Sequence, residues 1–325
     1  MMRIGIFGTG AYGMALSSVL TNNGCDVTMW TKFPEEKELL EKNRGNENYI
    51  PNFKLADSIK ITNDVGECIK EKDLLIIVIP AAFVRDLCID MKPYIDNNNI
   101  LIATKGIEQE TGLFVDEIVS SILNTTNIGV ISGPSFAIDL VSGKVEGLSL
   151  ASESTELIKI SKKALENNYV RLRETTDVKG VEICGSIKNV VAIASGIFEG
   201  LEANDSTKAM LIVESIHDIE EILEAFGCDR KTVLSYAGIG DILLTCTSTK
   251  SRNFTFGKII GEKKSREEID KYIKETTIEG YYTLESIYKL LRDKKVKIPL
   301  INLIHDIIVK GSDPELLFSF LISKS

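Results

Sequence analysis

Lys188 is the first residue whose type and position could do chemistry, because it borders the apolar stripe of a helix predicted over residues 181–201. Apolar residues recur there at helical spacing, at Val181, Cys184, Ile187, Val190, Val191, Ala194, Ile197 and Phe198. No residue three or four positions from Lys188 is a carboxylate, so its own helix offers it no ion-pair partner. Two interpretations stay open: a lysine whose ammonium reaches water along the core edge, or a partly desolvated one that exchanges protons near neutral pH.

Two polar loops further along the chain carry more candidates. Asp241 and Thr245 are four residues apart and share one face if a helix starts at G-I-G-D, although a plain N-cap explains Asp241 almost as well. Ser251, Arg252 and Asn253 offer a hydroxyl, a guanidinium and an amide just before a helical segment. This set suits a phosphate, and it is also ordinary for a polar surface loop.

The N-terminus contains a glycine-rich turn, G-T-G-A-Y-G, with Gly8, Gly10 and Gly13 around Ala11 and Tyr12. It follows a short apolar run at 3–7 and precedes a helical pattern at 14–22. In this context the first glycine allows a tight turn, the second lets backbone approach a pyrophosphate, and the third lets helix pack on strand. The segment therefore predicts a dinucleotide-binding site.

The second predicted strand, at 26–30, is expected to end beside the adenosine ribose, where an acidic residue usually selects NAD. Thr31 and Lys32 follow instead. Without that acid, and with a lysine in reach, a 2′-phosphate would be tolerated, which makes NADPH a plausible cofactor. An exposed Lys32 with no role in binding is an equally good interpretation.

The first half alternates apolar runs and amphipathic helical segments. Runs at 74–79, 100–104 and 128–132 are typical of parallel strands buried on both faces, and 35–42, 83–91 and 154–167 have a helical pattern; extra strands are expected at 147–151 and 169–173. We therefore predict a Rossmann-like, doubly wound α/β domain. Lys105 follows one strand, and the bend containing Gly133, Ser135 and Ala137 follows another, at the edge where such sheets bind ligands. A solvated strand end and a plain turn explain them as well.

After residue 178 the strand signal stops. Helical patterns cover 207–226, 230–236, 265–272, 282–292, 301–310 and 314–323 in addition to 181–201. The sequence thus predicts a dinucleotide-binding domain over residues 1–178 and an all-helical substrate domain over residues 179–325. We expect a small-molecule substrate to bind where the two meet.

Bulk properties exclude several classes of protein. The net charge of −9 over 325 residues disfavours nucleic-acid binding. Six scattered cysteines and two histidines make no plausible zinc set and are typical of reduced thiols in a cytoplasmic protein. The N-terminal apolar run is too short for a signal peptide and no run of 18 apolar residues occurs, so we expect no stable membrane insertion.

Eight motifs in order resemble the bacterial-type NAD(P)-dependent glycerol-3-phosphate dehydrogenases over nearly the whole chain. They are G-T-G-A-Y-G (8–13), N-E-N-Y-I-P (46–51), T-K-G-I-E (104–108), G-P-S-F-A (133–137), S-I-K-N-V-V-A-I-A-S-G (186–196), G-I-G-D-I-L-L-T-C-T (238–247), S-R-N-F-T-F-G (251–257) and E-G-Y-Y-T (279–283). The resemblance implies reversible hydride transfer between NAD(P)H and dihydroxyacetone phosphate, giving sn-glycerol 3-phosphate for phospholipid synthesis. It also allows a homodimer.

The resemblance also implies roles for single residues. Lys188 would be the proton acceptor, and Lys105 would contact both cofactor and substrate. Gly133, Ser135, Asp241, Ser251, Arg252 and Asn253 would line the substrate site. Ala137, Arg252 and Glu279 would lie near the cofactor, together with the glycine turn and Lys32.

Some positions depart from the family pattern. Ala11-Tyr12 and Lys32 stand where Ser-Trp and arginine are common, which removes no needed chemical function. Ser206 and Glu214 stand where asparagine and arginine are familiar. These last two keep open the alternative of a protein that senses NAD(P) without turnover. A separate alternative is another two-domain dehydrogenase with a helical second domain, of the 3-hydroxyacid or ketopantoate type.

Overall fold

The computed structural model describes residues 1–291, 294 and 296–323; Arg292, the last residue of the helix predicted over 282–292, lies outside this range. The chain forms two compact units, one of residues 1–105 with 115–178 and the other of residues 106–114 with 179–325. The short segment 106–114 therefore groups with the helical residues, although it lies within the first 178 residues of the chain.

The first unit is built on one eight-stranded sheet in the order β3-β2-β1-β4-β5-β6-β7-β8. The strands are β1 (Arg3–Phe7), β2 (Asp26–Trp30), β3 (Lys60–Thr62), β4 (Leu74–Ile77), β5 (Ile100–Ile102), β6 (Ile128–Ser132), β7 (Glu146–Ser152) and β8 (Val170–Thr175). Neighbouring strands from β3 to β6 are parallel, whereas β7 runs antiparallel to β6. This strand order confirms the predicted doubly wound α/β fold.

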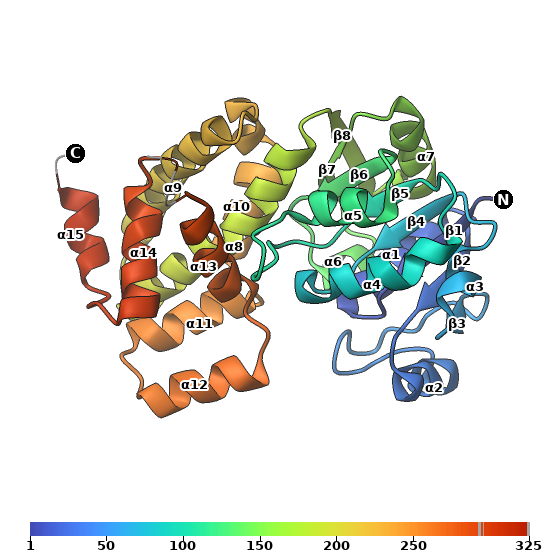
Figure 1. Ribbon diagram of the computed structural model, residues 1–325. Helices are drawn as coiled ribbons and strands as arrows, with labels where there is room; N and C mark the ends of the chain where they lie inside the picture. Colours follow the sequence, from blue (N-terminus) through green and yellow to red (C-terminus); the bar gives the residue numbers. More distant parts are fainter. Residues whose placement is uncertain (292–293, 295, 324–325) are drawn as a thin grey trace. The chain divides into compact units, whose positions relative to one another are not determined.

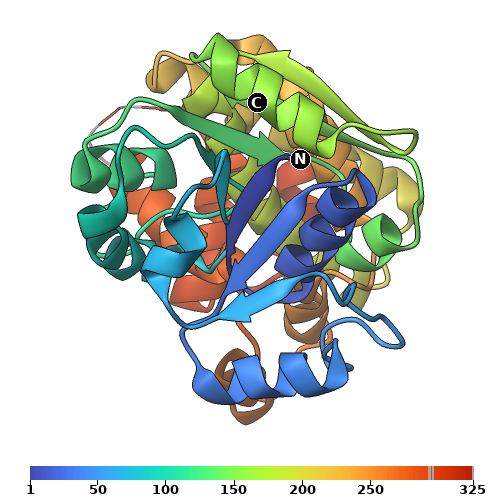
Figure 2. The same cartoon turned by 90° about the vertical axis from the view of Figure 1, so that its right-hand side faces the viewer.

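Helices cover both faces of this sheet. They are α1 (Ala11–Asn22), α2 (Pro34–Asn43), α3 (Val65–Ile69), α4 (Val84–Met91), α5 (Val115–Leu123), α6 (Ala137–Val141) and α7 (Thr155–Leu165). Helices α4 and α5 pack together, and α1 packs against α6 and α7. Figure 2 shows the first strands of the sheet with α1 beside them. The central strands β4 and β5 are buried throughout, as their continuous apolar sequence requires.

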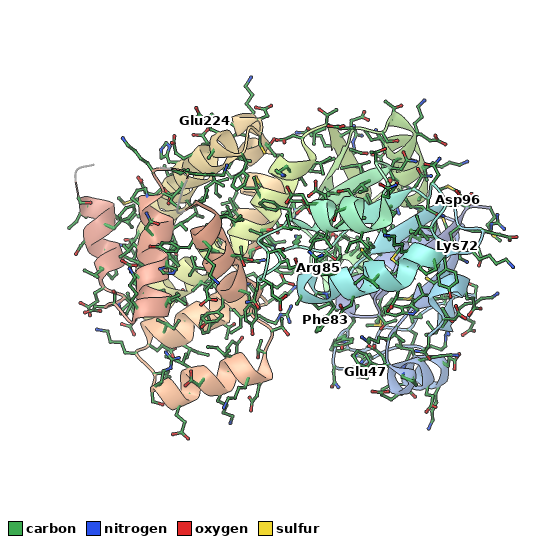
Figure 3. All side chains as sticks on the ribbon, in the orientation of Figure 1. Glu47, Lys72, Phe83, Arg85, Asp96 and Glu224 are labelled. Atoms are coloured by element: carbon green, nitrogen blue, oxygen red, sulfur yellow. The ribbon has the colours of Figure 1, made fainter. Side chains whose placement is uncertain are left out.

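The second unit is helical. Its helices are α8 (Val178–Gly200), α9 (Asp205–Ala225), α10 (Asp241–Cys246), α11 (Arg252–Gly261), α12 (Arg266–Glu275), α13 (Glu279–Leu291), α14 (Pro299–Lys310) and α15 (Leu316–Ile322), with a π-helical turn at Tyr236–Gly240 before α10. Residues 230–234 form a 3-10 helix. Near the end of α9 lies Glu224, which is labelled in Figure 3. Its carboxylate pairs with Arg230.

Helix α8 is the centre of this unit. Every residue from Gly180 to Phe198 is buried. Within the described chain it is the one helix long and apolar enough to cross a membrane, but its apolar window is fully buried, as in the core helix of a globular unit.

Glycines set the distance between α8 and α11. A Cβ on Gly196 would lie 2.0 Å from the carbonyl oxygen of Phe254, and one on Gly257 would lie 1.9 Å from that of Ile193. No side chain fits at either position without moving the backbone, so the two helices are in direct backbone contact. This contact holds the N-terminus of α11, with Ser251 and Arg252, against α8.

Candidate active site

The glycine turn has the geometry that a dinucleotide needs. Gly8 has a φ of +128°, which a side chain would strain, and a Cβ on Gly13 would lie 2.2 Å from the Gly8 carbonyl oxygen. Gly10 has no heavy atom within 4 Å of its Cβ position among the described residues. Helix α1 begins with no side-chain cap and no acid in its first turn, so its N–H groups suit a pyrophosphate.

The end of β2 differs in one respect from the expectation. Lys32 is exposed, but the buried Thr31 donates its hydroxyl to Glu36 Oε2 at 2.6 Å. An acidic group thus does reach this strand end, from the first turn of α2. The sequence pattern did not reveal it because Glu36 lies five residues beyond Thr31, inside a helix that carries several glutamates.

The remaining candidates of the first unit follow β5 and β6. Lys105 comes three residues after the end of β5, and Ala137 is the first residue of α6, which packs on α1. In the bend after β6, Ser135 Oγ lies 2.7 Å from Tyr12 Oη. The bend after β6 is therefore linked directly to the glycine turn.

Lys188 in the second unit is buried and paired, which excludes the interpretation that its ammonium lies in water. The residue is 8% exposed, and its Nζ donates to Asp241 Oδ1 at 2.7 Å and to Thr245 Oγ1 at 2.9 Å. Asp241 is 1% exposed. Asp241 and Thr245 lie on one face of α10, as the four-residue spacing predicted, and Thr245 donates in turn to Asp241 Oδ1 at 3.2 Å.

A second polar network lies one residue further along α8. Asn189 Oδ1 accepts from Asn253 Nδ2 at 3.0 Å, and Asn189 Nδ2 donates to Glu279 Oε2 at 3.3 Å. The Gly280 N–H donates to Asn253 Oδ1 at 2.9 Å. The network connects α8, α11 and α13 and fixes the amide of Asn253. Asn189 was not among the predicted site residues; its place beside Lys188 in S-I-K-N was the available signal.

Ser251 and Arg252 lie at the N-terminus of α11. Ser251 Oγ accepts the N–H of Phe254 at 3.2 Å and caps the helix. Arg252 is exposed, and no carboxylate of the described residues pairs with its guanidinium. A cation beside a helix N-terminus is suited to an anion such as phosphate.

Two of the departures from the family pattern lie on α9. Ser206 is exposed in its first turn, and Glu214 is partly buried. The Glu214 charge contributes to a raised pKa at Asp218, one turn further along the helix. Both positions are outside the Lys188 and Asn189 hydrogen bonds just described.

Taken together, a dinucleotide-binding sheet and a helical unit with a buried lysine–aspartate pair define a nicotinamide-dependent dehydrogenase of two units. Among the described residues no group of His, Cys, Asp and Glu could hold a metal ion. Two family models match the chain: NAD-dependent glycerol-3-phosphate dehydrogenase N-terminus over residues 3–158 and C-terminus over residues 177–319. The chain belongs to this family of NAD(P)-dependent oxidoreductases.

Relatives support this assignment over nearly the full length. A glycerol-3-phosphate dehydrogenase [NAD(P)+] of Staphylococcus epidermidis is 35% identical over 312 residues, covering 95% of this chain and 94% of the relative. That of Brachyspira hyodysenteriae is 32% identical, covering 100% and 98%. The crystal structure of glycerol-3-phosphate dehydrogenase from Coxiella burnetii has a TM-score of 0.93 at 30% identity, with 99% of each chain covered. The resemblance and the NAD(P)H cofactor are confirmed, and the 3-hydroxyacid, ketopantoate and sensor alternatives are not supported.

Proposed function

We propose that Lys188 is the proton-transfer residue in the reversible conversion of dihydroxyacetone phosphate to sn-glycerol 3-phosphate. NAD(P)H supplies the hydride when bound. In the reductive direction Lys188 Nζ gives a proton to the oxygen at C2 of the substrate, and in the oxidative direction it accepts the hydroxyl proton. The observation that carries this proposal is the buried Nζ held at 2.7 Å from Asp241 and 2.9 Å from Thr245.

Asp241 and Thr245 act as positioning residues for that nitrogen. Asp241 and Thr245 each accept one N–H of the ammonium, and together they fix the position of Nζ. Asp241 stabilises the protonated lysine between turnovers, and Thr245 limits the rotation of Nζ. A fixed proton donor is what efficient general acid–base catalysis requires.

Ser251, Arg252 and Asn253 are proposed to hold the substrate phosphate. Arg252 has the planar fork that binds two phosphate oxygens at once, and it lies at a helix N-terminus. Binding energy gained at the phosphate would be used to hold C2 in place for the chemical step.

The cofactor contacts are proposed on the first unit. The glycine turn, Gly8 to Gly13, would take the pyrophosphate, with Ala11 and Tyr12 contributing backbone, and Lys32 would lie near the ribose. Lys105 and Ala137 would also contact the cofactor, and Gly133 and Ser135 would contact the substrate. Arg252 and Glu279 of the second unit are proposed as further cofactor contacts.

The test is consumption of reduced nicotinamide, followed by absorbance, with dihydroxyacetone phosphate as substrate. We expect turnover with this substrate and with sn-glycerol 3-phosphate in reverse, and little with ketopantoate or a 3-oxo acid. Tight NADH binding without turnover of any of these compounds would instead support a sensing role.

We also propose a cytoplasmic location and a homodimer. The six cysteines are all free thiols, as is usual in reducing compartments. Met210 and Val213, which are 45% and 53% exposed and three residues apart on α9, are candidates for a contact between two copies. Sedimentation at several concentrations measures the assembly, and a monomer throughout would rule the dimer out.

A further inference from the structure

Glu146, the first residue of β7, is a buried acid that the fold alone does not explain. It is 8% exposed, and no described residue forms a hydrogen bond with its Oε2. A buried carboxyl oxygen without a partner is costly, so its retention calls for a reason in function.

Glu146 lies at the ligand-binding edge of the sheet. Ser132, the last residue of β6, pairs with Ser149 of the antiparallel β7, so Glu146 lies beyond the carboxyl end of β6. A Cβ on Gly133 would lie 2.7 Å from the Gly147 carbonyl oxygen. The bend after β6 therefore rests directly on the start of β7, at the edge where α/β sheets bind their ligands.

Ser135 links this acid to the glycine turn. The β6–β7 register, continued past Ser132, places Ser135 opposite Glu146, and the Ser135 hydroxyl lowers the pKa of the Glu146 carboxyl by acting on it as a hydrogen-bond donor. Ser135 Oγ also lies 2.7 Å from Tyr12 Oη. A serine hydroxyl has one proton to donate. When Glu146 is ionised, that proton goes to the carboxylate, and Ser135 offers only lone pairs to a ligand. When Glu146 is protonated, the acid can donate to Ser135, whose own proton is then available.

We propose that Glu146 is a positioning residue which, through Ser135, sets the affinity for the phosphorylated substrate, with the neutral acid favouring binding and the carboxylate opposing it. The inference rests on the proposed function, because Ser135 is taken there as a substrate contact. The carboxylate weakens binding in two ways, since it takes the Ser135 proton and places a negative charge near an anionic substrate.

Glu146 changes between its neutral and ionised forms near neutral pH. Burial, and after it the nearby Asp139, raise the pKa of Glu146 to about 7, against the lowering effects of the Ser135 hydroxyl and Lys144. Asp139 and Lys144 form an ion pair of 2.8 Å. Substrate affinity should therefore fall as the pH rises through neutrality.

The experiment measures KM for dihydroxyacetone phosphate in the wild type and in Glu146→Gln, which is neutral at every pH. Between about pH 6 and about pH 8.5, KM should rise roughly 3- to 10-fold more in the wild type than in the variant, the size of one lost hydrogen bond. The dissociation constant of sn-glycerol 3-phosphate, measured by calorimetry, should follow the same pattern. The comparison at each pH cancels the titration of the substrate phosphate itself.

Two further variants test the cause without altering Glu146. Asp139→Asn removes a charge that raises the pKa, so the rise in KM should move to lower pH. Lys144→Met removes a charge that lowers it, so the rise should move to higher pH. A purely structural Glu146 would not produce these opposite shifts.

Identical pH profiles in the wild type and Glu146→Gln, or unmoved midpoints in the two neighbouring variants, would overturn the inference. If Glu146→Gln does not fold, the Asp139 and Lys144 variants decide it alone. Absence of any turnover of dihydroxyacetone phosphate by the wild type is a different outcome, which would reject the proposed function itself.

Discussion

The pairing of Lys188 with a buried aspartate decides which variants can test its role. Its partner Asp241 is 1% exposed, so removing the lysine takes a cation away from a buried carboxylate, which typically costs about 3–5 kcal/mol. A simple alanine variant would therefore mix a loss of chemistry with a loss of stability.

For this reason we pair two variants of the lysine. Lys188→Met should lose about 10²–10⁴-fold in kcat, the usual contribution of a positioned proton-transfer group, and should also melt at lower temperature. Lys188→Met combined with Asp241→Asn should regain most of the melting temperature and none of the kcat. If the double variant regains activity together with stability, Lys188 has a structural role only.

Arg252 is predicted to act on the substrate phosphate. A charge-assisted guanidinium contact contributes about 1.5–3 kcal/mol, so Arg252→Ala should lower kcat/KM for dihydroxyacetone phosphate on the order of 10- to 150-fold. Lysine should rescue part of this, since a point charge does not reproduce the fork. Arg266→Ala, which removes an exposed arginine paired with Asp270, is the matched control and should have almost no effect.

The substrate analogue separates the two roles given to Arg252. Dihydroxyacetone lacks the phosphate, so it should be a poor substrate that Arg252→Ala makes no poorer. Equal losses on both substrates would mean that Arg252 acts through the cofactor or the fold.

Lys32 is predicted to favour the 2′-phosphate of NADPH. Lys32→Glu should lower kcat/KM for NADPH relative to NADH, because a negative charge would then face that phosphate. Lys37→Glu, on the following helix α2, is the control. An unchanged ratio in Lys32→Glu would make Lys32 a bystander and would direct attention to Glu36, whose carboxylate already reaches Thr31.

At the scale of elements, α14 is stabilised by an acid from another helix. Its N-cap residue, Ile298, has an apolar side chain that accepts no hydrogen bond. Asp218 of α9 accepts the Ile301 N–H at 2.8 Å instead. Burial raises the pKa of Asp218 from 3.8 to about 7. The folded protein thus keeps a proton that the unfolded chain loses above about pH 4.

The sign of the pH dependence follows from this difference. Between about pH 4 and pH 7 the folded state binds more protons than the unfolded state, so stability from this group falls as the pH rises. Asp218→Asn removes that dependence, at most about 4 kcal/mol for three pKa units. Its melting temperature relative to the wild type should therefore increase from pH 5 to pH 8. Asp96→Asn, on the surface (Figure 3), should show no such trend.

The sequence predicted most of the elements whose pattern is long enough to read, although the nine-residue helix α5 was not among them. The apolar runs of β1, β2, β4, β5 and β6 and the long helices α8 and α9 were all located, to within a few residues. Strand β3 and helix α6, of three and five residues, are too short to show a period. Periodicity and spacing alone do not predict the ion pair of Lys188 with Asp241, because the partners are 53 residues apart and meet only through the packing of α8 and α10. The family resemblance did imply that Asp241 orients the Lys188 ammonium, and the hydrogen bond between them agrees with it.

At the scale of the whole molecule, the chain leaves the first unit after Lys105 and returns to it at Val115. The intervening segment packs in the helical unit: the Phe114 ring lies 5.6 Å from that of Phe226 in an edge-to-face contact, and Gly112 lies against Leu290. Each unit has its own buried core, and the glycine turn belongs to the first.

Phe114→Ala should therefore weaken the helical unit rather than the nucleotide-binding one. Phe114 is 1% exposed, and truncation of a buried phenylalanine typically costs about 3–5 kcal/mol. NADH at about 100 times its Kd should stabilise the first unit by about 2.7 kcal/mol, because it binds only the folded form. Hydrogen exchange with and without NADH distinguishes the two effects. In Phe114→Ala, protection should fall in α9 and α13 and remain in β1 and α1, with NADH still raising the protection of β1 and α1.

Phe83→Ala is the control, because it removes a phenylalanine that is 59% exposed on the first unit (Figure 3), and it should leave both regions unchanged. Loss of protection around the glycine turn in Phe114→Ala would show that the segment 106–114 supports the first unit instead.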